Sequence, residues 1–176
     1  MSQITASDLE AAIRNVPDFP KPGIQFKDIT PVLGDAALFA GSIDLLASHH
    51  ADAGIDAVVG IDARGFIFAA AAARQLNAAF VPIRKKGKLP YKTIEENFQL
   101  EYGEDTVAIH EDALQPGARV LLLDDLLATG GTAAAAAKLV RKVGAEIVEI
   151  GFLIELSFLN GREKLNGHPI HSVITY

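Results

Sequence analysis

The stretch that most constrains this chain runs from residue 120 to residue 139 and reads VLLLDDLLATGGTAAAAAKL. Its first four residues are apolar, as in a parallel strand buried on both faces, and we expect the strand to end at Leu123. The alanine run favours a helix that begins between Thr129 and Thr132. A strand, a tight glycine turn and a helix place backbone N–H groups and a partial positive charge together, which suits a phosphate.

Two acids, Asp124 and Asp125, follow the predicted strand, and we expect both to face solvent. Carboxylates would repel a phosphate on its own, so the ligand must also offer hydroxyl groups or a divalent cation. A sugar phosphate with vicinal hydroxyls and Mg²⁺ meets both conditions. The alternative is an ordinary strand-to-helix turn, in which a threonine caps the helix and the acids complement its dipole.

The motif DDLLATGGT resembles the phosphoribosyl-pyrophosphate (PRPP) binding motif of the type I phosphoribosyltransferases, and most of all that of the members acting on adenine. Two further segments support the resemblance, DFPKPGIQFKDITP at 18–31 and RKKGKLP at 84–90. The resemblance extends from about Leu9 to about Lys164. It implies that adenine and PRPP react to give AMP and pyrophosphate, with Mg²⁺ as cofactor, in a cytoplasmic homodimer. Mg²⁺ would be held mainly by PRPP, with Asp124 or Asp125 as a candidate ligand.

The resemblance also implies roles for individual residues. The catalytic residues would be Asp124, Asp125 and Glu101, where the glutamate assists protonation at the purine N7. Adenine would contact Gln25, Phe26, Lys27 and Leu126, with the main chain of the extended 25–27 segment offering an acceptor beside a donor. The implied PRPP-binding residues are Arg64, Arg84, Lys88, Tyr102, Ala128, Thr129, Gly130, Gly131 and Thr132.

A second strand-to-helix turn, GIDARG at 60–65, follows another apolar run. Ligands of open parallel sheets bind at the carboxyl ends of the strands, so the two turns are expected to share a site. Arg64 would then grip a pyrophosphate with its forked guanidinium group. The alternative reading makes Asp62 a helix cap and leaves Arg64 in solvent.

The regular alternation of strands and helices breaks between Arg84 and Pro116, where basic residues cluster in an acidic chain. Apolar and polar residues alternate through Phe98 to Tyr102 and again through Thr106 to His110, which predicts a hairpin. Such an insertion is commonly a lid over a site, and the alternative is a solvated hairpin with incidental lysines.

The remaining pattern predicts an α/β fold with a mainly parallel sheet. Ser7 and Glu10 are spaced as a capping box for a first helix, and the prolines make 18–23 an extended connector. We expect a helix at 65–76. The expected strands are 24–26, 57–61, 79–83, 146–154 and 170–174. We expect a single domain over 1–176, with an N-terminal hood and base-recognition segment at 1–34 and a lid at 84–110.

Composition restricts the partners. A net charge of −6 and a pI near 5.3 argue against nucleic acid or an anionic membrane, and no apolar run is long enough to span a bilayer. We assign no histidine to metal binding, because His49 and His50 would point about 100° apart on a helix. Two other functions remain open: a phosphoribosyltransferase for another base, and a non-catalytic PRPP sensor, which would need a nucleic-acid-binding element.

Overall fold

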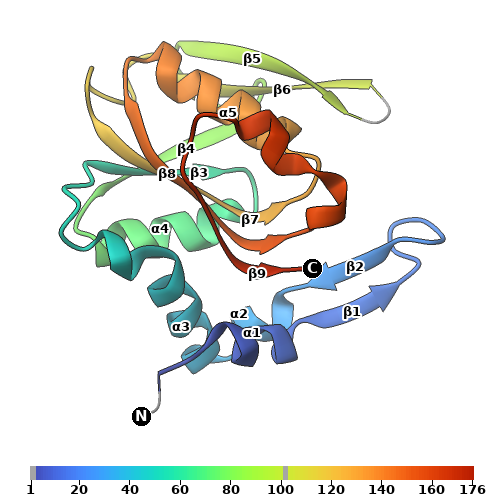
Figure 1. Cartoon of the computed structure of the whole chain (residues 1–176). Coiled ribbons are helices and arrows are strands. Elements are labelled where there is room, and N and C mark those ends of the chain that lie inside the picture. The colour runs from blue at the N-terminus through green and yellow to red at the C-terminus, as the bar shows by residue number, and fades with distance from the viewer. Residues whose placement is uncertain (1–2, 101–102) are drawn as a thin grey trace. The chain divides into compact units, whose positions relative to one another are not determined.

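The computed structural model describes residues 3–100 and 103–176, and the chain divides into two compact units, Met1–Leu45 and Leu46–Tyr176. Figure 1 shows the chain coloured from the N-terminus to the C-terminus. Among the described residues, no helix is both long and apolar enough to cross a membrane. The domain boundaries expected from the sequence, with a hood at 1–34 and a lid at 84–110, stay a prediction.

The first unit contains three helices and a two-stranded antiparallel sheet. A capping box begins the first helix, but its residues are Thr5 and Asp8, so the prediction of Ser7 and Glu10 was wrong. The Thr5 hydroxyl accepts the N–H of Asp8 at 3.3 Å, and the Asp8 carboxylate accepts the N–H of Thr5 at 2.9 Å. The shorter aspartate therefore performs the task usual for glutamate. The elements are α1 (Ala6–Ala12), β1 (Arg14–Pro17), β2 (Gln25–Asp28), α2 (Thr30–Gly34) and α3 (Ala36–Ala47).

The proline-rich segment at 18–23 is a turn between β1 and β2, so the extended connector expected there was wrong. The Phe19 N–H donates to the Ile24 carbonyl at 3.3 Å, and the Gly23 N–H donates to the Asp18 carboxylate at 2.7 Å. Pro17 is the last residue of β1 and lies opposite Gln25. A proline is tolerated there because its missing N–H interrupts only the end of an edge strand.

The second unit is a seven-stranded sheet in the order β5-β6-β4-β3-β7-β8-β9. The pairs β3–β4, β3–β7, β7–β8 and β8–β9 are parallel, which confirms the predicted α/β fold with a mainly parallel sheet. The strands are β3 (Ala57–Ile61), β4 (Ala79–Lys85), β5 (Thr93–Leu100), β6 (Gly103–His110), β7 (Arg119–Leu127), β8 (Glu146–Glu155) and β9 (Ile170–Thr175). The helices are η1 (Ser48–His50), α4 (Gly65–Gln75), α5 (Gly131–Lys142), η2 (Ser157–Leu159) and η3 (Gly161–Leu165).

Helices α4 and α5 cover opposite faces of the central strands (Figure 1). Side chains alternate between the faces of a strand. Val59 and Ile61 of β3 therefore join the core beneath the buried alanines of α5. Gly60 faces α4, where a Cβ would stand 2.7 Å from the Ala69 methyl group. The sheet is thus buried on both sides, and its strand ends carry the polar residues.

One expected strand boundary was wrong, and the predicted hairpin is confirmed. Strand β7 continues to Leu127 instead of ending at Leu123, because Leu126 and Leu127 stay in register with Ile154 and Glu155 of β8. The predicted hairpin is present as β5 and β6, and its second strand also joins the main sheet by pairing with β4.

The expectation that His49 and His50 point apart was also wrong. Both residues lie in the 3₁₀ turn η1, and the Nε2 atom of each lies 2.9 Å from the same Oε1 atom of Glu149 in β8. The 100° spacing applies to the backbone of an α-helix. Adjacent residues of a 3₁₀ turn are about 120° apart, so the backbone spacing does not bring the side chains together. The side-chain conformations, with both rings on the Glu149 carboxylate, bring the ring centroids to 4.1 Å.

Candidate active site

The carboxyl ends of β3 and β7 bring the two predicted turns together. One cavity, of about 220 Å³, is lined by both turns. This arrangement follows from the parallel pairing of β3 with β7, since neighbouring parallel strands end at the same edge. The lining residues are Asp62, Ala63, Arg64, Asp124, Asp125, Leu126 and Thr132.

A smaller adjoining cavity is formed by the glycine loop itself, from Leu126 to Ala133, with Asp124 at its side. Helix α5 begins at Gly131, as the sequence predicted, and its N-cap Gly130 has a φ of 76°. A left-handed residue followed by a helix start turns successive backbone N–H groups into one concavity. Among the described residues, no side chain caps this helix, so the geometry suits an anion at its N-terminus.

The two acids differ in environment. Asp125 was expected to face solvent, but it is buried. Asp125 is only 7% exposed, and its Oδ2 atom accepts a hydrogen bond from Arg64 Nε at 2.5 Å. The ion pair explains how a carboxylate is kept at a buried strand position. Burial, and then the charge of Asp125, raise the pKa of Asp124 well above its usual value. The cavity therefore holds one paired carboxylate and one that resists ionisation.

Close packing holds the two turns against each other. A Cβ at Gly65, the first residue of α4, would lie 2.6 Å from the Asp124 carboxylate. Only a glycine allows this approach of α4 to the end of β7.

Arg84, at the end of β4, connects the 60–65 turn to the segment that leads into the hairpin. Its Nε atom donates to the Asp62 carboxylate at 3.2 Å, and Nη1 donates to the Lys88 carbonyl at 3.0 Å. Arg84 is thus close to the cavity, whereas the Lys88 side chain is exposed. Glu101 and Tyr102 lie outside the described residues.

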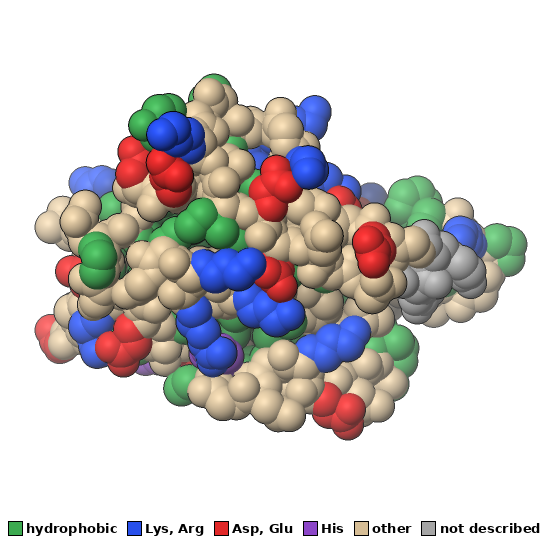
Figure 2. Space-filling model, turned by 90° about the horizontal axis from the view of Figure 1, so that it is seen from above, with side chains coloured by type: hydrophobic (Ala, Val, Ile, Leu, Met, Phe, Trp, Pro, Cys, Tyr) green, Lys and Arg blue, Asp and Glu red, His purple; other side chains and the backbone are tan. Residues whose placement is uncertain are grey.

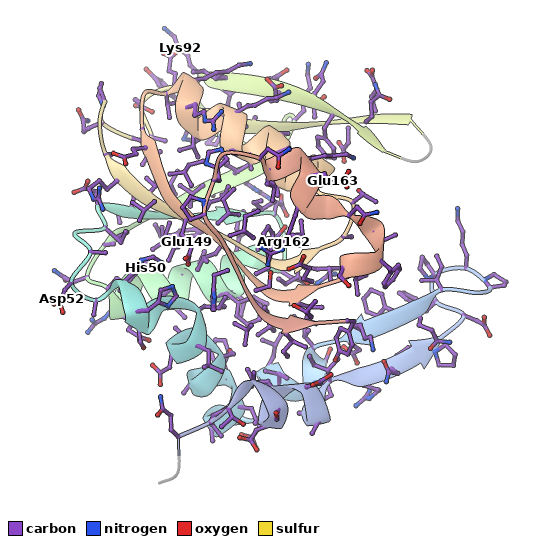
Figure 3. All side chains as sticks on the ribbon, viewed as in Figure 1. His50, Asp52, Lys92, Glu149, Arg162 and Glu163 are labelled. Carbon is purple, nitrogen blue, oxygen red and sulfur yellow. The ribbon has the colours of Figure 1, made fainter. Side chains whose placement is uncertain are left out.

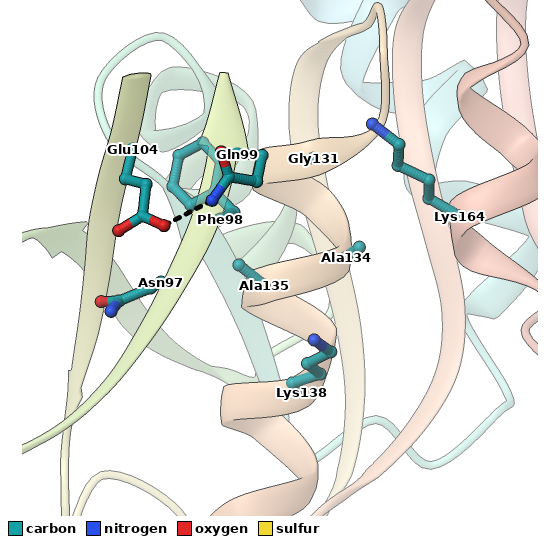
Figure 4. A pocket seen from close by; sticks show the side chains of 9 residues that line it. All are labelled: Asn97, Phe98, Gln99, Glu104, Gly131, Ala134, Ala135, Lys138 and Lys164. Atoms are coloured by element: carbon teal, nitrogen blue, oxygen red, sulfur yellow. Dashed lines mark hydrogen bonds between the residues drawn. The ribbon is translucent and has the colours of Figure 1, made fainter. Parts of the chain in front are cut away.

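A groove of about 540 Å³ separates strand β5 from the start of α5 (Figure 4). Gly131 contributes to this groove and also to the loop cavity, so the two lie next to each other. Two lysines of α5 bind the hairpin on this side, with Lys138 Nζ 3.0 Å and Lys142 Nζ 2.6 Å from the Glu96 carboxylate. The lining residues are Asn97, Phe98, Gln99, Glu104, Gly131, Ala134, Ala135, Lys138 and Lys164.

The basic residues of the hairpin region are matched by acids. Lys85 pairs with Asp105 at 3.0 Å, and Lys86 pairs with Glu95 at 2.8 Å. The face shown in Figure 2 likewise mixes Lys and Arg with Asp and Glu. The hairpin is therefore a mixed-charge surface, unlike the dominant basic stripe typical of nucleic-acid-binding proteins.

Comparison with known proteins places this geometry in a family. Residues 32–168 match the model of the phosphoribosyl transferase domain. The chain belongs to the phosphoribosyltransferase family. It is 54% identical over 173 residues to the adenine phosphoribosyltransferase of Chloroflexus aurantiacus, covering 98% of this chain and 100% of that protein.

Solved structures agree with this assignment. The adenine phosphoribosyltransferase of Rhodothermus marinus superposes with a TM-score of 0.92 at 53% identity and covers 97% of this chain and 98% of its own. The Saccharomyces cerevisiae enzyme, solved with an imino-altritol bisphosphate and adenine, superposes with a TM-score of 0.91 at 40% identity and covers 96% of this chain and 97% of its own.

Sequence reasoning missed the support beneath the glycine loop of this phosphoribosyltransferase. A Cβ at Gly130 would lie 2.3 Å from the Gly161 carbonyl oxygen, and a Cβ at Gly161 would lie 2.2 Å from that of Ala128. Segment η3 therefore packs backbone to backbone on the loop. The Asn160-Gly161 pair was a signal for a turn, but it could not reveal which segment the turn supports.

A buried ion pair holds η3 in place. Arg162 donates from Nε and Nη2 to the two carboxylate oxygens of Glu155, at 2.6 and 2.7 Å. Glu155 is 5% exposed, and these hydrogen bonds lower the pKa of its carboxyl group. The end of β8 thereby positions the segment that supports the loop.

The predicted adenine-binding residues fall in both units. Gln25, Phe26 and Lys27 form the start of β2 in the first unit, where the Phe26 ring meets the Phe19 ring edge-on at 5.1 Å. Leu126 lines the cavity of the second unit. Their common role in base recognition stays a prediction.

Proposed function

We propose that this protein transfers the 5-phosphoribosyl group from PRPP to adenine and releases AMP and pyrophosphate. The observation that carries the proposal is the cavity at the ends of β3 and β7. It combines an anion-binding helix start, two carboxylates and an arginine. The high identity to adenine phosphoribosyltransferases over nearly the whole chain favours adenine as the acceptor.

The 5′-phosphate would bind to the loop from Ala128 to Thr132, where backbone N–H groups and threonine hydroxyls converge. Asp124 and Asp125 would accept hydrogen bonds from the ribose hydroxyls. Arg64, which lines the same cavity, would bind the pyrophosphate, with Arg84 and Lys88 nearby.

In the reaction, the bond between C1′ and the pyrophosphate oxygen breaks and a bond between C1′ and adenine N9 forms. Pyrophosphate takes the bonding electron pair, the N9 lone pair forms the new bond, and the N9 proton passes to water. The ribose carries positive charge in the transition state, and carboxylates next to it stabilise that charge. We propose that Glu101 assists protonation at the purine N7 and that Tyr102 contacts PRPP.

The residues also fit a magnesium ion. Carboxylate oxygens are preferred Mg²⁺ ligands, and Mg²⁺ usually binds through one or two carboxylates plus substrate phosphates. We propose that Asp124 or Asp125 holds it together with PRPP. When bound, Mg²⁺ would neutralise charge on the leaving pyrophosphate.

For the base, we propose that Gln25 and Lys27 read adenine through main-chain groups and that Phe26 stacks on the ring. Residue 25 supplies a C=O and residue 27 an N–H along one edge of an extended strand. Hypoxanthine presents the reverse pattern, so it would leave both groups unpaired. Leu126 would be a further apolar contact. We also propose that the protein is a cytoplasmic homodimer, for which light scattering should give twice the 18.7 kDa chain mass.

The test is an assay with Mg²⁺, PRPP and each of adenine, hypoxanthine, guanine and orotate. We expect nucleotide formation with adenine to exceed the others by orders of magnitude. Asp125→Asn should lower kcat by about 10²-fold or more. Asp112→Asn, at an exposed position after β6, is the matched control. Equal activity with another base, or full activity of a folded Asp125→Asn protein, would overturn the assignment.

A further inference from the structure

A second group of ligand-type side chains lies away from the PRPP cavity. It consists of His49 and His50 from η1 and Glu149 from β8. Glu149 lies in register with Leu121, six residues before the Glu155 that pairs with Leu127 at the strand end. Six residues of strand span about 20 Å, so this cluster is well separated from the glycine loop.

The three side chains converge on one point. Their donor atoms all lie within 4.8 Å of one another, and each imidazole Nε2 is 2.9 Å from Glu149 Oε1. A tetrahedral zinc with nitrogen and oxygen ligands at their usual bond lengths would hold the donors about 3.3 Å apart. The two N···O distances therefore have to open by only a few tenths of an ångström to admit an ion.

The surroundings favour a bound cation. His50 is 7% exposed, and it lies beside Glu149 in Figure 3. The Glu149 side chain is 16% exposed, and its Oε1 atom faces both imidazole rings. The His49 side chain is 43% exposed and leaves a route from solvent.

A third histidine lies near the cluster. The ring of His171 lies 4.9 Å from that of His49, measured between centroids. His171 is opposite Gly151 in β9, on the same sheet face as Glu149, and Gly151 places no side chain between them. A ring in this position can orient His49 or approach the open side of an ion.

We propose that His49, His50 and Glu149 form a binding site for a transition-metal ion, with Zn²⁺ as the preferred occupant. Two imidazoles and one carboxylate are a zinc-type ligand set, and three protein ligands leave a fourth position for water. Imidazole ligands select Zn²⁺, Cu²⁺ or Ni²⁺ over Mg²⁺ and Ca²⁺. A bound ion would tie η1 to the middle of β8.

The experiment uses the full chain, treated with EDTA and desalted, with neither PRPP nor Mg²⁺ present. Titration with ZnCl₂ in a calorimeter should show one Zn²⁺ bound per chain. His49→Ala and Glu149→Gln should each weaken binding at least about tenfold. Zn²⁺ should raise the Tm of the unaltered protein more than that of either variant. Co²⁺ should give the visible absorption of a four-coordinate site.

Two control variants separate this site from other candidates. His168→Ala removes a histidine that contacts Arg141, and Asp124→Asn alters the PRPP cavity, and both should bind Zn²⁺ as the unaltered protein does. His49 is exposed enough that its replacement should leave the fold intact, which circular dichroism checks. Failure of the unaltered protein to bind Zn²⁺ would overturn the proposal. Undiminished binding by both His49→Ala and Glu149→Gln, or loss of binding in either control, would do so as well.

Discussion

At Asp124 a carboxylate is retained where burial disfavours its charge. Its pKa is raised above the unfolded value of 3.8 by burial and by the adjacent Asp125. The folded protein therefore binds more protons than the unfolded one between 3.8 and the raised pKa. The free energy of unfolding must fall as the pH rises through that window. The residue costs stability at neutral pH and is useful only when a ligand shares its charge.

Asp124→Asn should accordingly raise the Tm at pH 7 and weaken its decline with rising pH, while kcat falls by about 10²-fold. The amide keeps the oxygen that accepts the Asp125 N–H at 2.9 Å, so the turn should be preserved. Thermal unfolding across a pH series and steady-state kinetics measure the two effects. A Tm unchanged or lowered at every pH would mean that burial of this carboxylate carries no net cost.

Among the elements, η3 packs against the glycine loop, and the Glu155–Arg162 pair anchors η3 to the end of β8. Arg162→Gln should leave the buried Glu155 carboxylate without its bidentate partner and let η3 shift. We expect the KM for PRPP to rise about tenfold or more, with a smaller change in kcat. Arg141→Gln, at an exposed arginine of α5, is the control. A lower Tm with an unchanged KM would make the pair structural only.

The β5–β6 hairpin is the second element beside the loop. Gly131 lines both the loop cavity and the groove beside β5. A ligand bound in the loop should therefore restrain the motion of the hairpin. We therefore expect saturating PRPP and Mg²⁺ to slow tryptic cleavage at the lysines of 85–105 several-fold. Cleavage after Arg14, an exposed residue of the first unit, provides the internal comparison. Equal rates with and without ligand would show that the hairpin is no lid.

Elements buried on both faces were predictable, because an apolar run such as 57–61 has one reasonable interpretation. Both turns of the cavity were also found, since glycines and acids at strand ends stand out. Missed features depend on partners distant in the chain. The Arg64–Asp125 pair joins residues 61 positions apart, and the contact of Gly161 with the loop leaves no local pattern. The His49–His50 prediction failed because it considered only backbone spacing, whereas both rings turn toward Glu149, which is 100 and 99 positions away in the chain.

At the scale of the whole molecule, substrate binding should appear as stability. A ligand that binds only the folded state at 100 times its Kd adds about 2.7 kcal/mol to the free energy of unfolding. For a domain of this size, that is a Tm rise of roughly 5–10 °C. If Mg²⁺ accompanies PRPP into the cavity, replacing it with EDTA should remove most of the rise, because the pyrophosphate charge would then meet the carboxylates unscreened. An equal PRPP-induced rise in EDTA would show that the protein binds PRPP without the metal, and the carboxylates would then serve the ribose hydroxyls alone.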